Sequence, residues 1–234
     1  VKACYGFLVD NYKEHDEIFL FGFSRGAYVA RSLAGLIGTI GMLRKHEMDR
    51  FSDVWNWYWQ DEEDRDLAQL CALAPERRPE VDIDCIGVWD TVGALGIPGS
   101  RLCAKTFAFH ETELGPRVRH AFQALAIDEQ RGNFQSAVWV PYKPNRRRRG
   151  EPAIRRNNAA AVPNGPQQDL KQMWFPGVHS NIGGGYLLHG LSDTSFLWML
   201  SELRRLLGIN LNCVVDSLDR RPLQMYPRGT LDDS

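Results

Sequence analysis

The chain has 234 residues, which is enough for one domain with a full hydrophobic core. Hydrophobic residues make up 44% and charged residues 24%, and the net charge is −1, so no global field favours binding to nucleic acid. No apolar stretch approaches the roughly 18 residues that span a bilayer, and no signal-peptide pattern is visible. We expect cytoplasmic synthesis because the five cysteines are interpreted as reduced thiols.

The first two elements predicted are a helix over residues 1–13 and a strand over Glu17–Phe23. The strand is indicated by the apolar run that follows a polar turn. A second helix is predicted from Ala27 to a stop at Gly38 or Gly41. Apolar residues recur in this helix at three- and four-residue steps and form one face: Ala27, Ala30, Ala34 and Ile37.

The segment Gly22-Phe23-Ser24-Arg25-Gly26 lies between this strand and this helix. A G-x-S-x-G at such a junction is the nucleophile elbow of the α/β-hydrolases, a sharp turn that raises the serine Oγ above the sheet. We expect small residues to be required two positions either side of Ser24, and the backbone N–H of Arg25 to stabilise an oxyanion. The alternative is a glycine-rich turn in which Ser24 only caps the helix.

The middle of the chain alternates between predicted helices and strands. We predict a helical region over residues 47–70, a turn over Pro75–Glu80, a strand over Asp82–Asp90 and a glycine-containing loop over Thr91–Gly99. A short helical piece over residues 116–123 and three short strands follow: Ala124–Ile127, Ala137–Val140 and Gln172–Phe175.

Residues 144–170 are predicted to be a mobile loop, because this stretch has no periodicity and carries the basic run Arg146–Arg149. The last predicted element is a helix from about Thr194 to Leu207, capped by Ser192 or Asp193. One face of this helix is expected to carry Phe196, Leu200, Leu203 and Leu207. Strands that alternate with helices indicate an α/β fold with a mostly parallel sheet.

A serine nucleophile needs a histidine base, and that base is usually oriented by a carboxylate. Of the six histidines, His179 follows a predicted strand inside a glycine-rich loop and is the preferred base. His15, His46, His110, His120 and His189 lie in less suitable contexts. The alternative interpretation of His179 is a histidine in a surface loop.

Two aspartates end predicted strands at the carboxyl edge of the sheet, where α/β sites form. Asp90 is the preferred carboxylate, because Gly93 and Gly96 allow an open loop beside it. Asp128 stays as the alternative acid, and either residue is also a reasonable loop cap. The pair Asp82 and Asp84 is expected to be solvated charge, as are the acids at residues 61–64.

Four motifs occur in the order that a known family gives them: G-F-S-R-G-A, G-V-W-D-T-V-G-A-L-G, A-L-A-I-D-E and W-F-P-G-V-H-S-N-I-G-G-G-Y. They run from about residue 5 to residue 194. The chain thus resembles an uncharacterised α/β-hydrolase domain family that includes antibacterial phospholipase effectors of type VI secretion. The resemblance implies an α/β-hydrolase fold, acyl-ester hydrolysis of lipid or phospholipid, secretion as an effector, and a triad of Ser24, Asp90 and His179.

The chain departs from the family in two places. The family has Asp two residues after the histidine, where this chain has Asn181. Family members also carry early strands well upstream of the elbow, and Ser24 has only 23 residues before it. We therefore expect a partial α/β-hydrolase domain over residues 1–234 that lacks the second oxyanion N–H.

Cysteines and aromatic residues complete the sequence-based expectations. The five cysteines, an odd number without metal-type spacing, are expected to be reduced and mostly packing groups. Five large aromatics lie within nine residues of the segment 51–59, more than one helix face can bury. Phe51, Trp55 and Trp59 recur at four-residue spacing, and we expect core packing for this stripe. Contact with an acyl chain or a membrane surface is the alternative. Arg146–Arg149 is a candidate for contact with anionic headgroups, but usually such a run is solvated.

The function predicted from the sequence is a serine esterase or lipase that acts on a lipid-type ester through an acyl-enzyme. No metal and no organic cofactor are expected, and nucleic acid is not an expected partner. The alternative is a weak or inactive α/β-hydrolase-like module that binds a membrane or a protein partner. The sequence does not indicate the oligomeric state.

Overall fold

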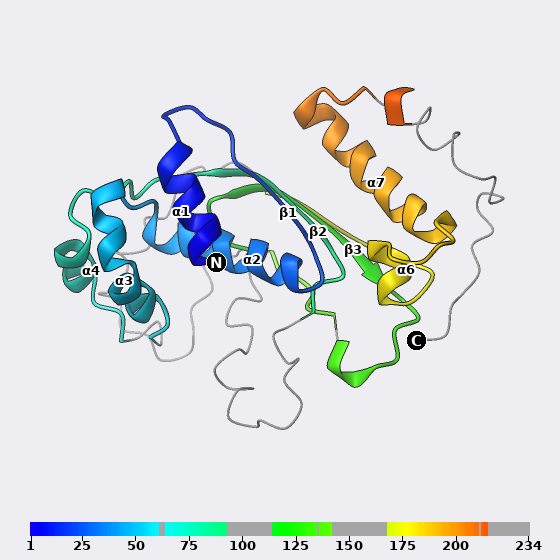
Figure 1. Ribbon diagram of the computed structural model, residues 1–234, viewed down its shortest axis with the longest axis horizontal. Coiled ribbons are helices and arrows are strands. Elements are labelled where there is room, and N and C mark those ends of the chain that lie inside the picture. The colour runs from blue at the N-terminus through cyan, green and yellow to red at the C-terminus, as the bar shows by residue number, and fades with distance from the viewer. Residues whose placement is uncertain (61–63, 93–113, 135, 142–167, 211, 215–234) are drawn as a thin grey trace.

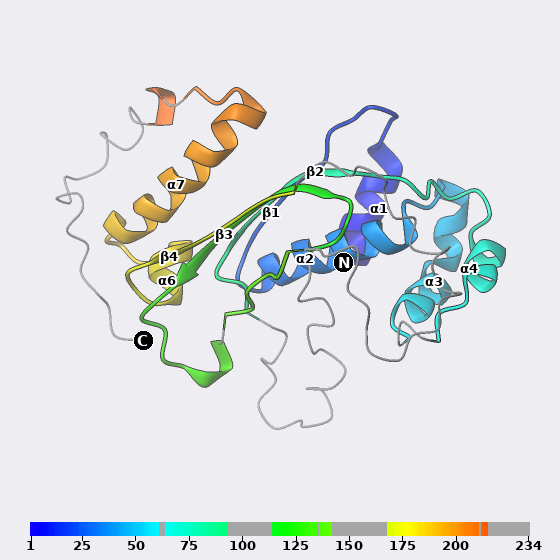
Figure 2. The same ribbon diagram turned by 180° about the vertical axis from the view of Figure 1, so that it is seen from behind.

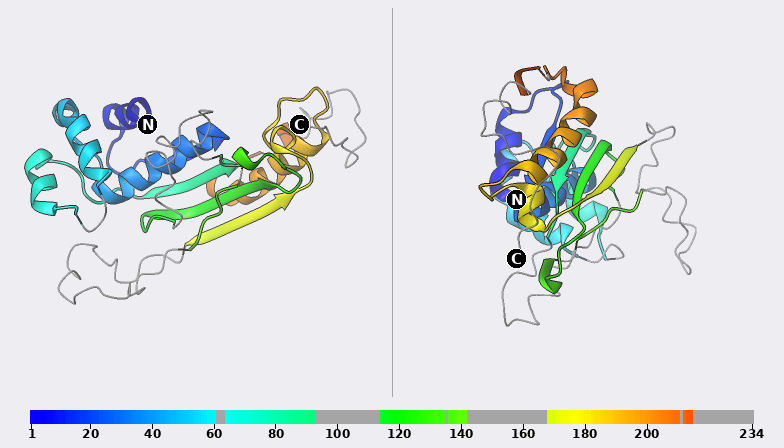
Figure 3. Two further views of the ribbon diagram at one scale, coloured as in Figure 1. Left: turned by 90° about the horizontal axis from the view of Figure 1, so that it is seen from below. Right: turned by 90° about the vertical axis from the view of Figure 1, so that its right-hand side faces the viewer.

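The computed structural model describes residues 1–60, 64–92, 114–134, 136–141, 168–210 and 212–214. At its centre is a four-stranded sheet in the order β1-β2-β3-β4. The strands are β1 Phe19–Phe23, β2 Ile83–Trp89, β3 Val118–Ala126 and β4 Asp169–Phe175. All neighbouring strands are parallel, and their arrowheads point the same way in Figure 3. The α/β architecture with a parallel sheet is therefore confirmed.

Helices cover both faces of this sheet. α2, Arg25–Ile40, packs against β1 and β2 on one face, and α7, Gly190–Leu207, packs against β3 and β4 on the other (Figure 1). The short helix α6, His179–Gly183, connects β4 to α7 at the carboxyl end of the strands, as seen from behind in Figure 2. α1, Lys2–Asn11, confirms the helix expected at the start of the chain.

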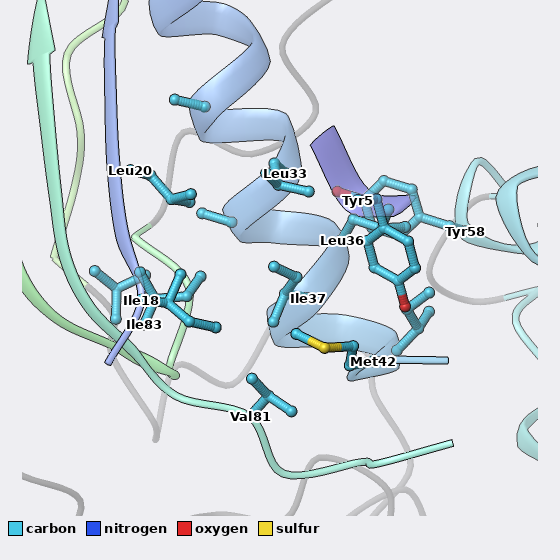
Figure 4. Close-up of a cluster of buried hydrophobic side chains, with 14 of the residues drawn as sticks. Tyr5, Ile18, Leu20, Leu33, Leu36, Ile37, Met42, Tyr58, Val81 and Ile83 are labelled. Carbon is cyan, nitrogen blue, oxygen red and sulfur yellow. The ribbon is translucent and has the colours of Figure 1, made fainter. Parts of the chain in front are cut away.

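The main core lies between α2 and the sheet. All four residues of the expected α2 face are buried. In Figure 4, Ile37 of α2 faces the strand residues Ile18 and Ile83, and Leu36 lies next to Tyr5. Gly41, with φ of 77°, ends α2 as expected.

Tyr5 joins α1 to the segment that follows α2. Its hydroxyl donates to the Gly41 carbonyl and accepts from the Leu43 N–H, both at 2.9 Å. Burial raises the pKa of Tyr5 well above its ordinary value, so the phenol stays neutral and can donate. The α1 helix is thereby fastened to the end of α2.

The second core, on the other face, corrects the expected face of α7. Besides Gly190 at its start, the buried positions of α7 are Leu191, Ser195, Met199 and Leu203, which recur every four residues. Of the expected face only Leu203 is buried; Phe196 is 39% and Leu207 42% exposed. The helix also begins at Gly190, earlier than expected, so Ser192 and Asp193 lie in its first turn instead of capping it. Ser195 is buried without penalty because its hydroxyl donates to Ile182 and Ser192 carbonyls at 2.7 and 3.0 Å.

Three other secondary-structure predictions were wrong in detail. Residues 116–123 do not form a helical piece, because β3 runs from Val118 and absorbs the short strand expected after it. Within Ala137–Val140 only Val140 is a bridge position, so this segment is not a regular strand. The single helical region expected over residues 47–70 is divided into a 3₁₀ helix Lys45–Arg50, α3 Phe51–Tyr58 and α4 Leu67–Leu73.

Several expectations fall partly or wholly outside the described residues. These are the loop after Asp90, most of the basic segment predicted as a mobile loop, His110 and Cys103. The final two residues of that predicted loop, 169 and 170, belong to β4. Within the described part of the chain, none of the helices is both long and apolar enough to cross a membrane.

Of the described cysteines only Cys85 is buried; Cys4, Cys71 and Cys213 are exposed, which corrects the packing role expected for most of them. Asp82 and Asp84 are also not simply solvated. Both carboxylates bond Arg119, at 2.9 and 2.7 Å.

Candidate active site

The turn that carries Ser24 is strained and tightly packed. Ser24 lies between β1 and α2 with φ of 56° and ψ of −121°, a backbone conformation that non-glycine residues rarely adopt. Its N–H donates to the Trp89 carbonyl at 3.0 Å, so the end of β2 supports the turn. A strained serine held at a strand-to-helix turn has the local geometry of a nucleophile elbow.

The two glycines that flank Ser24 are not equivalent, which corrects a sequence-based expectation. A Cβ on Gly22 would lie 2.4 Å from the carbonyl oxygen of Gly26, closer than real Cβ contacts allow. A Cβ on Gly26 would meet nothing within 4 Å. Only the glycine before the serine is therefore required by the space available.

Ser24, His179 and Asp90 lie in hydrogen-bond contact, although they are far apart in the sequence. His179 Nε2 lies 2.8 Å from Ser24 Oγ, and His179 Nδ1 lies 2.7 Å from Asp90 Oδ2. With the proton on Nδ1, the imidazole donates to the Asp90 carboxylate and accepts from the serine hydroxyl. This is the arrangement in which a serine can pass its proton to histidine as it attacks.

Asp90 directly follows β2 and is completely buried. Its second carboxylate oxygen, Oδ1, accepts from the Ala126 N–H at 3.1 Å and from the Ser136 hydroxyl at 2.9 Å. The backbone of Asp90 is itself at a positive φ of 37°. These bonds fix the carboxylate and satisfy its remaining lone pairs, as a buried charge requires.

The alternative acid, Asp128, is engaged elsewhere. Its carboxylate accepts from the Gly177 N–H at 2.6 Å, and its own N–H donates to the Gly177 carbonyl at 3.2 Å. Asp128 therefore fastens the turn after β4 to the end of β3. Its described contacts do not include the imidazole of His179.

His179 does not lie in an open loop as expected, because it is the first residue of α6. Asn181 Oδ1 accepts from the Val178 N–H at 3.0 Å, so this side chain closes the start of the helix. Gly177, with φ of 109°, allows the chain to turn before it, and a Cβ there would meet the Asn181 side chain at 2.6 Å. The Asn181 amide thus makes a bond that needs an oxygen acceptor and no charge.

Two aromatic rings enclose the imidazole. The Phe23 ring centroid lies 4.6 Å from that of His179, and the Phe134 centroid lies 4.9 Å away in an edge-on contact. Gly183 leaves room for Phe23, since a Cβ there would lie 2.1 Å from that ring. The imidazole is 5% exposed, so its position is determined by packing as well as by hydrogen bonds.

Sequence reasoning missed Glu129 and Arg131. The Glu129 carboxylate accepts from the His179 N–H at 3.2 Å, and Arg131 bonds both oxygens of that carboxylate. The signal in the sequence was the A-L-A-I-D-E motif, in which only the aspartate was considered.

Arg25 is the first residue of α2, so its N–H lies among those at the helix start that have no partner within the helix. Such a group, next to the Ser24 side chain and at the positive end of the helix dipole, suits a developing negative charge. Arg25 is exposed, so this side of the elbow is open to solvent.

A pocket of about 450 Å³ opens beside the elbow, between β1 and the start of α7. Its apolar lining includes Phe21, Phe23 and Phe196, and its polar lining includes His189, Ser192 and Asp193. Since Gly22 and Gly183 also line it, this pocket adjoins both the serine turn and the histidine helix.

The aromatic cluster of residues 51–59 does not line this pocket. Phe51, Trp57 and Tyr58 are buried in the main core, and Trp55 packs against Phe51, Tyr58 and Trp59. In Figure 1, α3 lies beyond the end of α2 that is farther from α6. Packing against the core is therefore confirmed for this cluster, but the most buried rings besides Phe51 are Trp57 and Tyr58, while Trp55 and Trp59 are partly buried.

Comparison with known proteins adds a family to this geometry. The family model described as "T6SS, Phospholipase effector Tle1-like, catalytic domain" matches residues 1–202. An uncharacterised Saccharomyces cerevisiae protein, YEL023C, is 34% identical over 150 residues, which cover 60% of this chain. The aligned part is 21% of that protein, so the chain spans about a fifth of the length of this curated relative. No solved structure matches the chain.

Proposed function

The chain belongs to the Tle1-like family of T6SS phospholipase effector catalytic domains, and from this premise we propose that it is a serine hydrolase that cleaves the acyl esters of lipids. The parallel sheet is, in this proposal, the centre of an α/β-hydrolase fold. The observation that carries the proposal is the continuous contact from Ser24 through His179 to the buried Asp90.

In the proposed reaction, Ser24 Oγ attacks the ester carbonyl carbon while His179 Nε2 accepts the hydroxyl proton. Asp90 stabilises the imidazolium that forms and keeps Nδ1 protonated. The N–H of Arg25 donates to the oxyanion. The alcohol leaves with the proton from His179, and water then hydrolyses the acyl-enzyme by the same steps.

A lipid ester is favoured over a small polar ester by the pocket as well as by the family. The apolar side chains of Phe21, Phe23 and Phe196 offer a surface for an acyl chain next to the serine turn. The side chains of Ser192 and Asp193 line the same pocket and can accept hydrogen bonds from hydroxyl groups of a glycerol or a headgroup. We therefore expect a glycerophospholipid to be a better substrate than a short soluble ester.

The test is labelling with a fluorophosphonate, followed by peptide mass, on the wild-type chain and on Ser24→Ala and His179→Ala. Ser201→Ala and His46→Ala are matched controls, because both residues are exposed and lie outside the site. We expect one adduct on Ser24, lost in the two site variants and kept in both controls. Absence of an adduct on wild-type Ser24 would contradict the hydrolase proposal.

A second measurement tests the substrate class. Fatty acid release is followed from mixed micelles of a glycerophospholipid and from a short-chain soluble ester. We expect release from the lipid to be faster and to disappear in Ser24→Ala. Turnover of the soluble ester alone would keep the serine hydrolase and overturn the lipid assignment.

A further inference from the structure

The carboxylate of Glu129 connects the end of β3 to the backbone of His179. Glu129 Oε2 accepts from the His179 N–H at 3.2 Å, across 50 residues of sequence. The Glu129 side chain is only 3% exposed. A carboxylate withdrawn from water to this extent needs compensating bonds, so its place beside His179 is specifically supported.

Arg131 supplies that support. Its Nε donates to Glu129 Oε1 at 2.9 Å and its Nη2 to Oε2 at 2.8 Å, which is the bidentate geometry of a strong ion pair. The Arg131 backbone N–H also donates to Oε1, at 2.8 Å. These bonds lower the pKa of Glu129 to about 2, chiefly through the side-chain bond from Arg131. Glu129 is therefore an ionised acceptor with a fixed orientation.

The same arginine also orders a ring that contacts the imidazole. The Arg131 guanidinium lies 3.8 Å from the centroid of Phe134, and the Phe134 ring meets His179 edge-on at 4.9 Å. Glu129 thus contacts the backbone of His179, and Phe134 contacts its side chain. Both contacts originate in the six-residue segment 129–134, and Arg131 joins them.

The start of α6 needs such support because the helix has only five residues. A helix this short does not hold its own conformation in water. His179 nevertheless has to keep Nε2 within hydrogen-bond reach of Ser24 while Nδ1 bonds Asp90. Asn181 closes the helix start from within, and Asp128 holds Gly177 two residues earlier, while Glu129 bonds the backbone of His179 itself.

We infer that Glu129 is a positioning residue for His179, held by Arg131, and that it keeps the imidazole in line between Asp90 and Ser24. The inference rests on the proposed function, since it assigns a role in that reaction. Glu129 touches neither Ser24 nor the pocket and acts only through His179. A displacement of about 1 Å in such a constellation costs on the order of 10²-fold in rate.

The test compares Glu129→Ala with Glu129→Gln and with the control Asp84→Asn. Asp84 is a matched control because its carboxylate also pairs with an arginine, Arg119, and also accepts a backbone N–H, from Ile18 at 2.9 Å. Asp84 is the second residue of β2 and so lies at the opposite end of the strand from Asp90. Asp84→Asn therefore removes the carboxylate charge of an arginine pair away from the site, as Glu129→Gln does beside His179.

Two readouts are measured on each variant. One is the rate of fluorophosphonate reaction at Ser24 as a function of probe concentration, which separates the maximal rate from the half-saturating concentration. The other is the far-downfield proton resonance of His179 Nδ1–H, assigned by its loss in His179→Ala. The melting temperature of each variant is recorded beside them.

We expect Glu129→Ala to lower the maximal rate by about 10–10²-fold, with little change in half-saturating concentration, and to shift or broaden the resonance. Glu129→Gln keeps an oxygen acceptor for the His179 N–H and should recover part of the rate. Asp84→Asn should leave both readouts unchanged, even where its melting temperature falls as far. An unchanged resonance in Glu129→Ala, or an equal loss of rate in Asp84→Asn, overturns the inference.

The resonance separates this inference from the proposed function. If the wild type shows the His179 resonance but no adduct on Ser24, the hydrolase proposal fails. The response of the resonance to Glu129→Ala then still decides whether Glu129 positions the imidazole.

Discussion

The Cβ position of Gly22 lies 2.4 Å from the carbonyl oxygen of Gly26, so the turn around Ser24 closes against its own backbone. The relationship is one-sided, because a Cβ on Gly26 points into open space. In this G-x-S-x-G pattern, the close contact requires glycine at residue 22 but does not require it at residue 26.

We predict that Gly22→Ala is strongly destabilising and that Gly26→Ala is tolerated. The first change forces backbone apart, and overpacking of this kind costs about 1–3 kcal/mol or more. The second places alanine near the start of α2, where it favours helix by up to about 1 kcal/mol over glycine. Urea unfolding of the two variants measures the difference, and equal losses of stability would contradict the geometry of the turn.

The choice between the two candidate acids can be tested by Asp90→Asn and Asp128→Asn. Asparagine at residue 90 can present its amide to His179 Nδ1 and favour the wrong tautomer, and we expect a loss of about 10⁴-fold in kcat. Asp128 contacts the Gly177 backbone instead, so its replacement should lower stability more than kcat. Ester turnover and melting temperature are measured together. A larger kcat loss in Asp128→Asn would reverse the assignment.

Asn181 provides an oxygen acceptor to the Val178 N–H, and this is the property that we expect to matter. Asn181→Asp retains the acceptor and should leave stability nearly unchanged. Asn181→Ala removes the bond from a buried helix start and should cost about 0.5–2 kcal/mol. Chemical denaturation of both variants is the measurement. If Asn181→Asp is as damaging as Asn181→Ala, the amide N–H₂ group rather than the oxygen is the essential part.

Glu129 should make the free energy of unfolding depend on pH in the acidic range. Its pKa falls from an ordinary 4.5 to about 2 in the folded chain. The carboxylate therefore adds stability that is complete above its unfolded pKa and is lost as pH falls from about 4.5 towards 2. The stability difference between wild type and Glu129→Gln should be constant above about pH 5 and shrink below it. Urea midpoints across this range test the prediction, and a difference that does not change with pH would refute it.

The part of the fold near the elbow was predictable because its signals are local. The apolar run before Ser24 and the alanine face after it need no information from the rest of the chain, and β1 and α2 are where they were expected. Ser24, Asp90 and His179 were each chosen from their place at the end of a predicted strand. The structure brings the three side chains into contact, and their catalytic roles stay predictions.

β3 was harder to recognise because its burial has no alternation. From Ala121 to Ala126 every residue is buried, so the period of two that marks a half-exposed strand is absent. Arg119, Gln123 and the alanines of β3 also favour helices in isolation. The sheet contacts on both sides decide the outcome here, and a single sequence does not contain them.

Glu129 could not be assigned from sequence because its role depends on a turn formed much later in the chain. Its partner is the backbone N–H of His179, which any residue could supply, so no side-chain pattern marks the pair. The buried face of α7 differs from the predicted face for a similar reason. Ser195 is buried because carbonyls of Ile182 and Ser192 accept its proton, and hydrophobicity alone does not predict that.

The 155 residues that separate Ser24 from His179 also determine when the site can form during folding. Contacts of such sequence separation form slowly, because a long loop must close before they add any stability. β1, β2, β3 and β4 must all be paired before His179 can reach the serine. Recovery of Ser24 reactivity after dilution from denaturant should therefore lag behind the return of helical circular dichroism, and the serine would report on the completion of the whole sheet.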